Sequence, residues 1–247
     1  MVGALQYLTI TRPDISFAVN QVCQFMHQPT TIHWSAVKRI LRYLKTTNTH
    51  GLYYRPGSLT LTAFSDADYA GNPDDRHSIG GYCIFLGHNP ISWSAKKHRT
   101  ISHSSIEAEY RQLAYTAAEI SWFRSLFKDL GISLTIPLIL CDNISSISLA
   151  SNPVFHSRIK HLEVDYHYVR EKVIRKELEV RYLSTTDQVA DIFTKGLSFV
   201  RLKNLANKLM VHACPISLRG CDSDKLTKPN QGIDYSNSSK IRPIEPT

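Results

Sequence analysis

The chain has 247 residues, 43% hydrophobic and 20% charged, which is enough for one well-packed domain and a smaller piece. Its net charge of +8 favours a polyanionic partner, either nucleic acid or an acidic membrane surface. No apolar run approaches the roughly 18 residues of a membrane span, and the first residues show no signal peptide. The five scattered cysteines include no C-x-x-C pair, which favours a reducing intracellular compartment, cytoplasmic or nuclear.

Residues 1–50 carry a helical pattern. In TTIHWSAVKRILRYLKTT the apolar residues recur at spacings of three and four, which predicts one apolar helix face. The residues of this face are Trp34, Val37, Leu41 and Leu44. Basic residues flank it at Lys38, Arg39, Arg42 and Lys45. We expect this small helical segment to end near Gly51.

Residues 52–211 change to a mixed pattern. The alternation in SLTLTAF predicts a half-buried strand, and GGYCIFLG and ISWSAKK predict two more, in an antiparallel meander. SHSSIEAEYRQLAYTAAEISWFRSLFKDLG predicts a long helix that ends at Gly131. Ser104 and Glu107 fit a capping box at its start.

The rest of this region adds strands and helices in alternation. PLILC and LEVRYL predict strands, and NISSISLASN and RIKHLEVDYHYVREKVIRK predict helices. TTDQVADIFTKGL opens a predicted final helix. This order favours a mixed sheet with helices on both faces. Residues 212–247 contain prolines and many polar residues without periodicity, which predicts a disordered tail. The expected domains are therefore 1–50, 52–211 and 212–247.

Four acids lie at informative positions along these elements. Asp66 stands where the first strand is expected to end and could be a turn residue. Asp142 ends the PLILC run and could cap the next helix. Asp191 lies in the first turns of the last helix, where the helix dipole favours a solvated acid. Glu109 borders the apolar stripe of the long helix, where an unpaired carboxylate costs free energy.

These four acids can converge on one edge of a mixed sheet. Carboxylates brought together repel unless a cation joins them, and Mg²⁺ takes carboxylate oxygens together with substrate phosphates. Two such ions about 4 Å apart hold a phosphodiester for in-line attack by water. The sequence therefore predicts a basic surface that binds a phosphate backbone and an acidic site that holds the metal.

Several motifs in order carry a family resemblance. FSDADYAG, SSIEAEY, CDN, HSRIKH and DQVADIFTKGL resemble the ribonuclease H domain of copia-type LTR-retrotransposon Pol polyproteins. YLTITRPDISFAVNQVCQFM and HWSAVKRILRYLKTT resemble the thumb or connection segment that joins the reverse transcriptase to that domain. The resemblance covers roughly residues 1–211.

The resemblance implies an α/β, RNase H-like fold with a five-stranded mixed sheet whose first three strands are antiparallel. It also implies that Asp66, Glu109, Asp142 and Asp191 are catalytic residues that bind two Mg²⁺ or Mn²⁺ ions. The implied reaction hydrolyses the RNA strand of an RNA–DNA hybrid and leaves 3′-hydroxyl and 5′-phosphate ends. As part of an intact element, such a protein is expected in a virus-like particle.

The sequence departs from the family pattern at two places. Cellular and retroviral ribonucleases H carry a histidine in the loop before the last Asp, but the loop here is STTDQ, residues 184–188, so Asp187 or water would have to serve. The Tyr-x-Asp-Asp motif of a polymerase palm is missing, since the only adjacent pair, Asp74–Asp75, lies in a turn-like stretch. We therefore expect the ribonuclease part of a truncated Pol polyprotein.

Basic residues near the expected site are candidates for contacts with nucleic acid. They are Lys96, Lys97, Arg99, Arg158, Lys160 and His161. Such runs are usually solvated connections, yet beside a nuclease site they also suit phosphate contacts. Two alternatives to the enzyme remain open: a noncatalytic nucleic-acid-binding pseudo-nuclease left by transposon decay, and an inert fragment. The expected partners are an RNA–DNA hybrid and the remainder of a Pol polyprotein, with no membrane.

Overall fold

The computed structural model describes residues 1–72, 74–151 and 163–213, which belong to one compact unit, Met1–Cys214. Arg158, Lys160, His161 and nearly all of the tail predicted at 212–247 lie outside these ranges. Within the described residues, no helix combines the length and the apolar character needed to cross a membrane.

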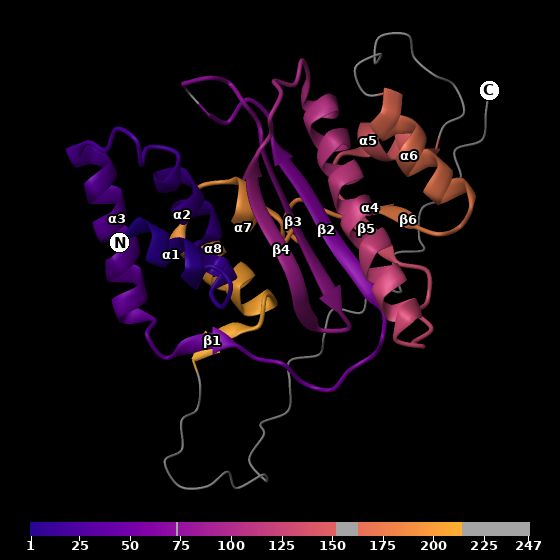
Figure 1. Cartoon of the computed structure of the whole chain (residues 1–247), viewed down its shortest axis with the longest axis horizontal. Coiled ribbons are helices and arrows are strands. Elements are labelled where there is room, and N and C mark those ends of the chain that lie inside the picture. The colour runs from indigo at the N-terminus through magenta and orange to yellow at the C-terminus, as the bar shows by residue number, and fades with distance from the viewer. Residues whose placement is uncertain (73, 152–162, 214–247) are drawn as a thin grey trace, which may run out of the picture. The chain divides into compact units, whose positions relative to one another are not determined.

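A five-stranded mixed sheet forms the centre of the unit (Figure 1). Its strands are β2 (Leu61–Asp68), β3 (Ile79–Leu86), β4 (Asn89–Lys97), β5 (Leu138–Cys141) and β6 (Glu179–Tyr182). The spatial order is β4-β3-β2-β5-β6. The first three strands pair antiparallel, β5 pairs parallel with β2, and β6 pairs parallel with β5. This topology confirms the RNase H-like fold that the resemblance implied.

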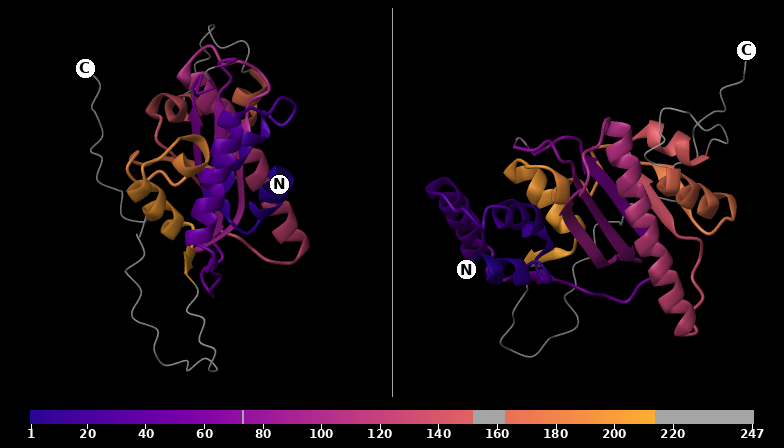
Figure 2. Two further views of the ribbon diagram at one scale, coloured as in Figure 1. Left: turned by 90° about the vertical axis from the view of Figure 1, so that its left-hand side faces the viewer. Right: turned by 45° about the horizontal axis from the view of Figure 1, so that its top comes forward.

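Helices cover both faces of the sheet (Figure 2). Successive strand residues point to opposite faces. A Cβ added at Gly80 of β3 would meet Gln112 of the long helix α4 (Ser105–Asp129), whereas one at Gly81 would meet Phe193 of α7 (Asp191–Thr194). The helices α4 and α7 therefore pack on opposite faces at neighbouring residues of one strand.

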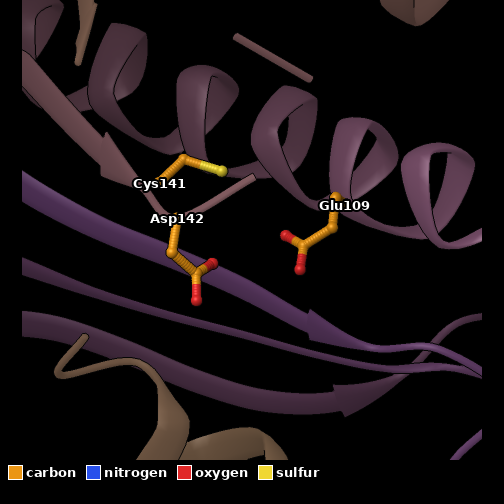
Figure 3. Close-up of side chains that lie close together, drawn as sticks. All are labelled: Glu109, Cys141 and Asp142. Carbon is orange, nitrogen blue, oxygen red and sulfur yellow. The ribbon is translucent and has the colours of Figure 1, made fainter. Parts of the chain in front are cut away.

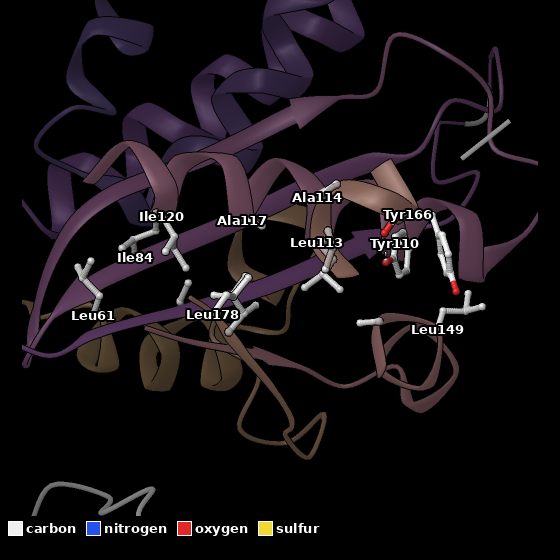
Figure 4. Close-up of a cluster of buried hydrophobic side chains, with 14 residues drawn as sticks. Leu61, Ile84, Tyr110, Leu113, Ala114, Ala117, Ile120, Leu149, Tyr166 and Leu178 are labelled. Atoms are coloured by element: carbon white, nitrogen blue, oxygen red, sulfur yellow. Dashed lines mark hydrogen bonds between the residues drawn. The ribbon is translucent and has the colours of Figure 1, made fainter. Parts of the chain in front are cut away.

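The main hydrophobic core lies on the α4 face (Figure 4). There Leu61 and Ile84 of the sheet and Leu113 and Ile120 of α4 are fully buried or nearly so. Two more helices, α5 (Ile144–Ser151) and α6 (Glu163–Ile174), contribute to the same core. Tyr166 and Val169 of α6 are buried in it. This packing fixes α4, and with it Glu109, against the sheet.

The start of α4 matches its predicted capping residues in part. The Ser104 hydroxyl accepts a hydrogen bond from the Glu107 amide at 3.1 Å. The Glu107 carboxylate accepts from the amide of His103 at 2.8 Å, one residue before the position of a capping box, and also pairs with Arg111 at 2.8 Å. Gly131, with φ of +73°, follows the end of the helix.

The N-terminal segment forms helices around a hydrophobic cluster of its own. Its elements are α1 (Val2–Leu8), η1 (Pro13–Ile15), α2 (Ser16–Cys23) and α3 (Thr31–Thr46). On α3 the buried residues are Val37 and Ile40, with Leu41 and Leu44 partly buried. Trp34 is 47% exposed, so the predicted apolar face turns toward Ile40 and away from Trp34.

Three elements differ from the sequence prediction. The strand β2 continues through Asp68, so Asp66 and Asp68 lie within a strand and not in a turn. The predicted last helix is two helices, α7 and α8 (Phe199–Lys208), because Lys195 is extended and Ser198 caps a new helix. Two short strands, β1 (His50–Leu52) and β7 (Val211–Ala213), pair antiparallel, so regular structure runs past residue 211.

Candidate active site

Asp66 is placed by the central strand. It is fully buried in β2 and lies opposite Gly81 of β3. Its Oδ2 accepts a hydrogen bond from the Thr194 hydroxyl, and its Oδ1 lies 3.1 Å from the Lys195 ammonium. Burial raises the pKa of Asp66 to about 6 against the opposing effect of Lys195 and Thr194. The carboxylates of Asp191 and Asp142 raise it further, which places both near Asp66.

Glu109 is the least satisfied acid of the site. It lies early in α4, is 7% exposed, and its Oε2 has no hydrogen-bond partner among the described residues. Burial raises the pKa of Glu109 to about 9, and the carboxylates of Asp66 and Asp142 raise it further. A buried carboxylate with an open oxygen is costly unless a cation completes it.

Asp142 follows the end of β5 and is partly buried. Its Oδ2 accepts a hydrogen bond from the Thr185 hydroxyl at 2.9 Å. The helix-capping alternative belongs to its neighbour, because the Asn143 side chain accepts from the Ser146 amide at 3.0 Å. Asp142 is therefore available to a ligand without disturbing the start of α5.

Glu109, Cys141 and Asp142 present potential ligand atoms within 4.8 Å of one another (Figure 3). The Cys141 thiol is buried, which raises its pKa, and it accepts a hydrogen bond from the Asn143 amide at 3.4 Å. Mg²⁺ and Mn²⁺ prefer oxygen ligands, and thiolates favour softer metals. The two carboxylates therefore suit such an ion better than the Cys141 thiol beside them does.

Asp191 is buried at the start of α7 and is not a solvated acid. Its Oδ1 lies 2.7 Å from the Lys195 ammonium, and its Oδ2 pairs with Arg201 of α8. Lys195 thus contacts Asp66 and Asp191 together. Burial lowers the pKa of Lys195, but the two carboxylates outweigh this and raise it above its usual value.

The structure brings the four acids together from different parts of the fold. Asp66 lies in β2, Glu109 in α4 and Asp191 in α7, and Asp142 directly follows β5. Their donor set fits a hard divalent cation, because it consists of carboxylate oxygens and one of them, Oε2 of Glu109, is buried without a partner among the described residues. Sequence reasoning missed the groups that orient these acids: Thr185, Thr194, Lys195 and Arg201. Of these, only Lys195 left a signal, its i+4 spacing from Asp191.

The predicted nucleic-acid residues have different surroundings. Lys96 and Arg99 are exposed, but Lys97 pairs with Asp75 and lies 3.3 Å from the Gln24 side chain. Lys97 is opposite Ile79, which is opposite Asp68, so this basic stretch lies at the end of the sheet that carries Asp66. In the loop that lacks histidine, Asp187 pairs with Lys208 at 2.9 Å.

Two plant proteins show high similarity to the chain. It is 50% identical over 222 residues to the "Retrovirus-related Pol polyprotein from transposon RE2" of Arabidopsis thaliana, a match that covers 89% of the chain and 15% of that protein. The corresponding RE1 protein of the same plant is 52% identical over 219 residues, 88% of the chain and 15% of the relative. The chain thus spans about 15% of the length of these relatives.

Similarity to solved structures is weaker, and no protein-family model matches the chain. LC11-RNase H1 in complex with an RNA/DNA hybrid is 14% identical, with a TM-score of 0.43 over 55% of this chain and 94% of that one. Strand order and strand direction therefore define the fold more firmly than this likeness does. The sequence similarity, in contrast, extends over most of the chain at half of all positions. Over most of its length the chain is therefore similar to one part of the retrovirus-related Pol polyproteins of copia-type transposons.

Proposed function

We propose that this chain is a metal-dependent ribonuclease H that hydrolyses the RNA strand of RNA–DNA hybrids. One observation carries the proposal: Glu109, buried and with Oε2 unpartnered among the described residues, lies within the electrostatic reach of Asp66 and Asp142. A fold has no stability to gain from such an arrangement, because burial and like charges both disfavour ionised carboxylates. Binding of a divalent cation to these carboxylates would offset both costs.

Asp66, Glu109, Asp142 and Asp191 would hold Mg²⁺ or Mn²⁺. When bound, the metal supplies a water of lowered pKa and stabilises negative charge on the phosphate. The protein's own contribution is orientation. Thr194 fixes Asp66, Thr185 fixes Asp142, and Arg201 fixes Asp191, so the carboxylates do not have to reorganise when substrate arrives.

The choice of substrate is supported by charge and by family. The net charge of +8 suits a nucleic acid, and we assign backbone contacts to Lys96 and Arg99, which are exposed at the end of the sheet that carries Asp66. Phosphate contacts position a nucleic acid, whereas recognition of its RNA strand requires contacts with 2′-hydroxyls. The relatives are retrovirus-related Pol polyproteins, for which removal of RNA from a hybrid is the ribonuclease step that the resemblance implies.

Asp142→Asn tests the proposal. We expect cleavage of the RNA strand of a labelled hybrid in Mg²⁺ to fall by about 100-fold or more, because a ligand charge is lost. Hybrid binding should persist, since the basic surface is unchanged. Without metal the variant should be at least as stable as the wild type, because a carboxylate that raises the pKa of Glu109 is gone while Asn143 still caps α5.

Glu171→Gln is the matched control, since it removes one negative charge from an exposed ion pair with Arg175 outside the cluster. It should cleave within about threefold of the wild type, as surface ion pairs contribute little. Cleavage that survives EDTA, or normal cleavage by Asp142→Asn, would contradict the proposal. Hybrid binding by a wild-type protein that cleaves nothing would support the noncatalytic nucleic-acid-binding alternative instead.

A further inference from the structure

The carboxylate cluster has two unlike halves. Within the described residues, Glu109 and Asp142 form no ion pair. Asp66 and Asp191 form the other half, and the ammonium of Lys195 lies between them, 3.1 Å from one and 2.7 Å from the other. One half is thus open to a cation, and the other already contains one that the chain supplies itself.

We propose that Lys195 is a built-in cation that occupies the Asp66–Asp191 half of the site in the metal-free protein and competes there with a divalent ion. A first ion then binds at the open half, and a second ion binds only when the Lys195 side chain withdraws. This inference rests on the proposed metal-dependent function and adds to it an order of ion binding and a residue that sets that order.

The contacts of the individual oxygens support this role. Lys195 contacts Oδ1 of both aspartates, whereas Oδ2 of Asp66 accepts from Thr194 and Oδ2 of Asp191 pairs with Arg201. Withdrawal of one side chain would therefore free two carboxylate oxygens that face a common point. The other two oxygens would keep their partners, so both aspartates would stay in place.

The position of Lys195 in the chain permits this withdrawal. It stands just after α7 with an extended backbone, at φ of −127° and ψ of 148°, and its side chain is 34% exposed. A lysine side chain has a flexible four-carbon stem and a strongly hydrated ammonium, so it can move into water without a change in the backbone. Asp66, in contrast, is fixed in the central strand.

Competition and plain structural support predict opposite effects of removing the ammonium. In both cases the metal-free protein loses stability, because two buried carboxylates are left without their shared cation. If Lys195 only supports the site, its loss should weaken metal binding. If Lys195 competes, its loss should tighten metal binding, because an adjacent like charge disappears.

The experiment is a Mn²⁺ titration of the full chain, wild type against Lys195→Met, followed by calorimetry and by the electron paramagnetic resonance signal of free Mn²⁺. We expect the wild type to bind one ion more tightly than a second. In Lys195→Met the second ion should bind about tenfold more tightly. The metal-free thermal midpoint of the variant should fall, and Mn²⁺ should raise it by more than it raises that of the wild type.

Lys208→Met is the matched control, because it removes the same charge from a lysine that pairs with Asp187 outside the cluster. Both of its Mn²⁺ affinities should stay within about twofold of the wild type, since screening weakens exposed charges at a distance. If Lys195→Met does not fold without metal, Lys195→Gln replaces it, since glutamine keeps hydrogen-bond donors and lacks the charge. The same tightening is expected.

The outcomes separate this inference from the proposed function. Equal or weaker binding of Mn²⁺ by both Lys195 variants, beside a wild type that binds Mn²⁺ and cleaves hybrid, would overturn the competition alone. A wild type that binds no Mn²⁺ would overturn both the competition and the metal-dependent ribonuclease. Tighter binding of the second ion by a Lys195 variant, and not by Lys208→Met, would establish Lys195 as a competitor.

Discussion

Hydrogen bonds decide which single residues of the site remain open to a ligand. Asp142 and Asn143 are adjacent and both have the chemistry of a helix cap. Asn143 accepts the amide of Ser146, while Asp142 accepts, among the described residues, the hydroxyl of Thr185 alone. One lone pair on Asp142 is used to orient it, and the rest remain available. The same logic applies to Asp66, whose Oδ2 is oriented by Thr194.

His98 is a buried residue within a basic stretch of sequence. It lies between Lys97 and Arg99 in sequence, yet it is 4% exposed, and its Nε2 lies 3.3 Å from the Gln112 amide oxygen. Burial lowers the pKa of His98 below its ordinary 6.5; the Gln112 contact raises it in part, while Arg111 and His77 lower it further. His98 is therefore a neutral core residue and not part of a basic surface.

We expect His98→Gln to remove part of the acid sensitivity of the fold. Because the folded pKa of His98 is lower than the unfolded value, its contribution to stability is complete above about pH 6.5 and is lost as the pH falls below it. The thermal midpoint of the metal-free wild type should therefore fall more between pH 7.5 and 5.5 than that of the variant. If the thermal midpoints of the two proteins fell equally between these pH values, protonation of His98 would not destabilise the fold.

The four acids could be predicted as residues, but their partners could not. Glu109 stands out because turn, cap or dipole roles explain it poorly at an apolar helix border, whereas Asp66 could be read as a turn residue unless it is grouped with the other acids. Thr185 and Arg201 come from a loop and from α8, and they reach the acids only through tertiary packing. Lys195 lies four residues after Asp191, a spacing that predicts an ion pair, but the pair with Asp66 spans 129 residues of sequence.

Among the elements, α7 is short but sets the position of a whole side of the site. It rests on β3 at Gly81, directly beside Asp66, and its four residues include Asp191 and Thr194. Local patterns could not show this, because the approach of a helix to a glycine on a strand leaves no periodicity. The same holds for β1 and β7, three residues each, whose pairing joins distant parts of the chain.

The extension of β2 has a different cause. Alternation stops after Ala63 because the central strand is covered on both faces, and its residues are buried almost without interruption through Ala67. A pattern of period two detects half-buried strands and therefore ends too early here. The bounds of α4 were predicted more closely, because Ser104 marks its start and Gly131 follows its end.

Gly81→Ala tests the role of α7. The added Cβ would lie 2.7 Å from the Phe193 Cβ and 2.8 Å from the Thr194 Cγ2, so α7 must shift. We expect a loss of about 1–3 kcal/mol in unfolding free energy from overpacking. Hybrid cleavage should fall about 10- to 100-fold because Asp191 moves, whereas hybrid binding should persist.

Gly51→Ala is the control for this variant, since nothing lies within 4 Å of a Cβ at that strand position. It should change neither stability nor cleavage appreciably. A Gly81→Ala protein with a lowered thermal midpoint and normal cleavage would show that the position of α7 does not govern the site.

At the scale of the whole unit, polar contacts join the hydrophobic cluster of the N-terminal segment to the sheet. The N-terminal segment buries Leu5, Val19 and Ile40 in a cluster of its own. It is connected to the sheet by the Trp93 indole, which donates to the Thr9 carbonyl at 3.0 Å. Residues 1–50 and 52–211 remain our proposed domains, each with its own hydrophobic core. By its internal contacts, Met1–Cys214 is one compact unit.

The pairing of β1 with β7 predicts where the folded unit can be cut. A chain that ends at Cys214 retains β7, but one that ends at Val211 loses two of its three residues, including His212, whose ring stacks on Tyr53 with centroids 4.4 Å apart. We expect the shorter chain to be less stable by about 1–2 kcal/mol, from the lost strand pairs and the lost stack. At this size, that corresponds to a drop of about 2–8 °C in thermal midpoint relative to the chain that ends at Cys214.

The physical reason is topological. The strand β1 directly follows the helices of the N-terminal segment, and β7 directly follows α8, whose Arg201 pairs with Asp191. Loss of β7 should therefore loosen both the N-terminal segment and the support of the site, and limited proteolysis should cut near residues 47–53 sooner in the shorter chain. His212→Ala in the chain that ends at Cys214 isolates the stack and should account for about half of the loss. Equal midpoints for the two truncated chains would mean that β1 and β7 add no stability, and that other contacts, such as that of Trp93 with Thr9, hold the N-terminal segment to the sheet.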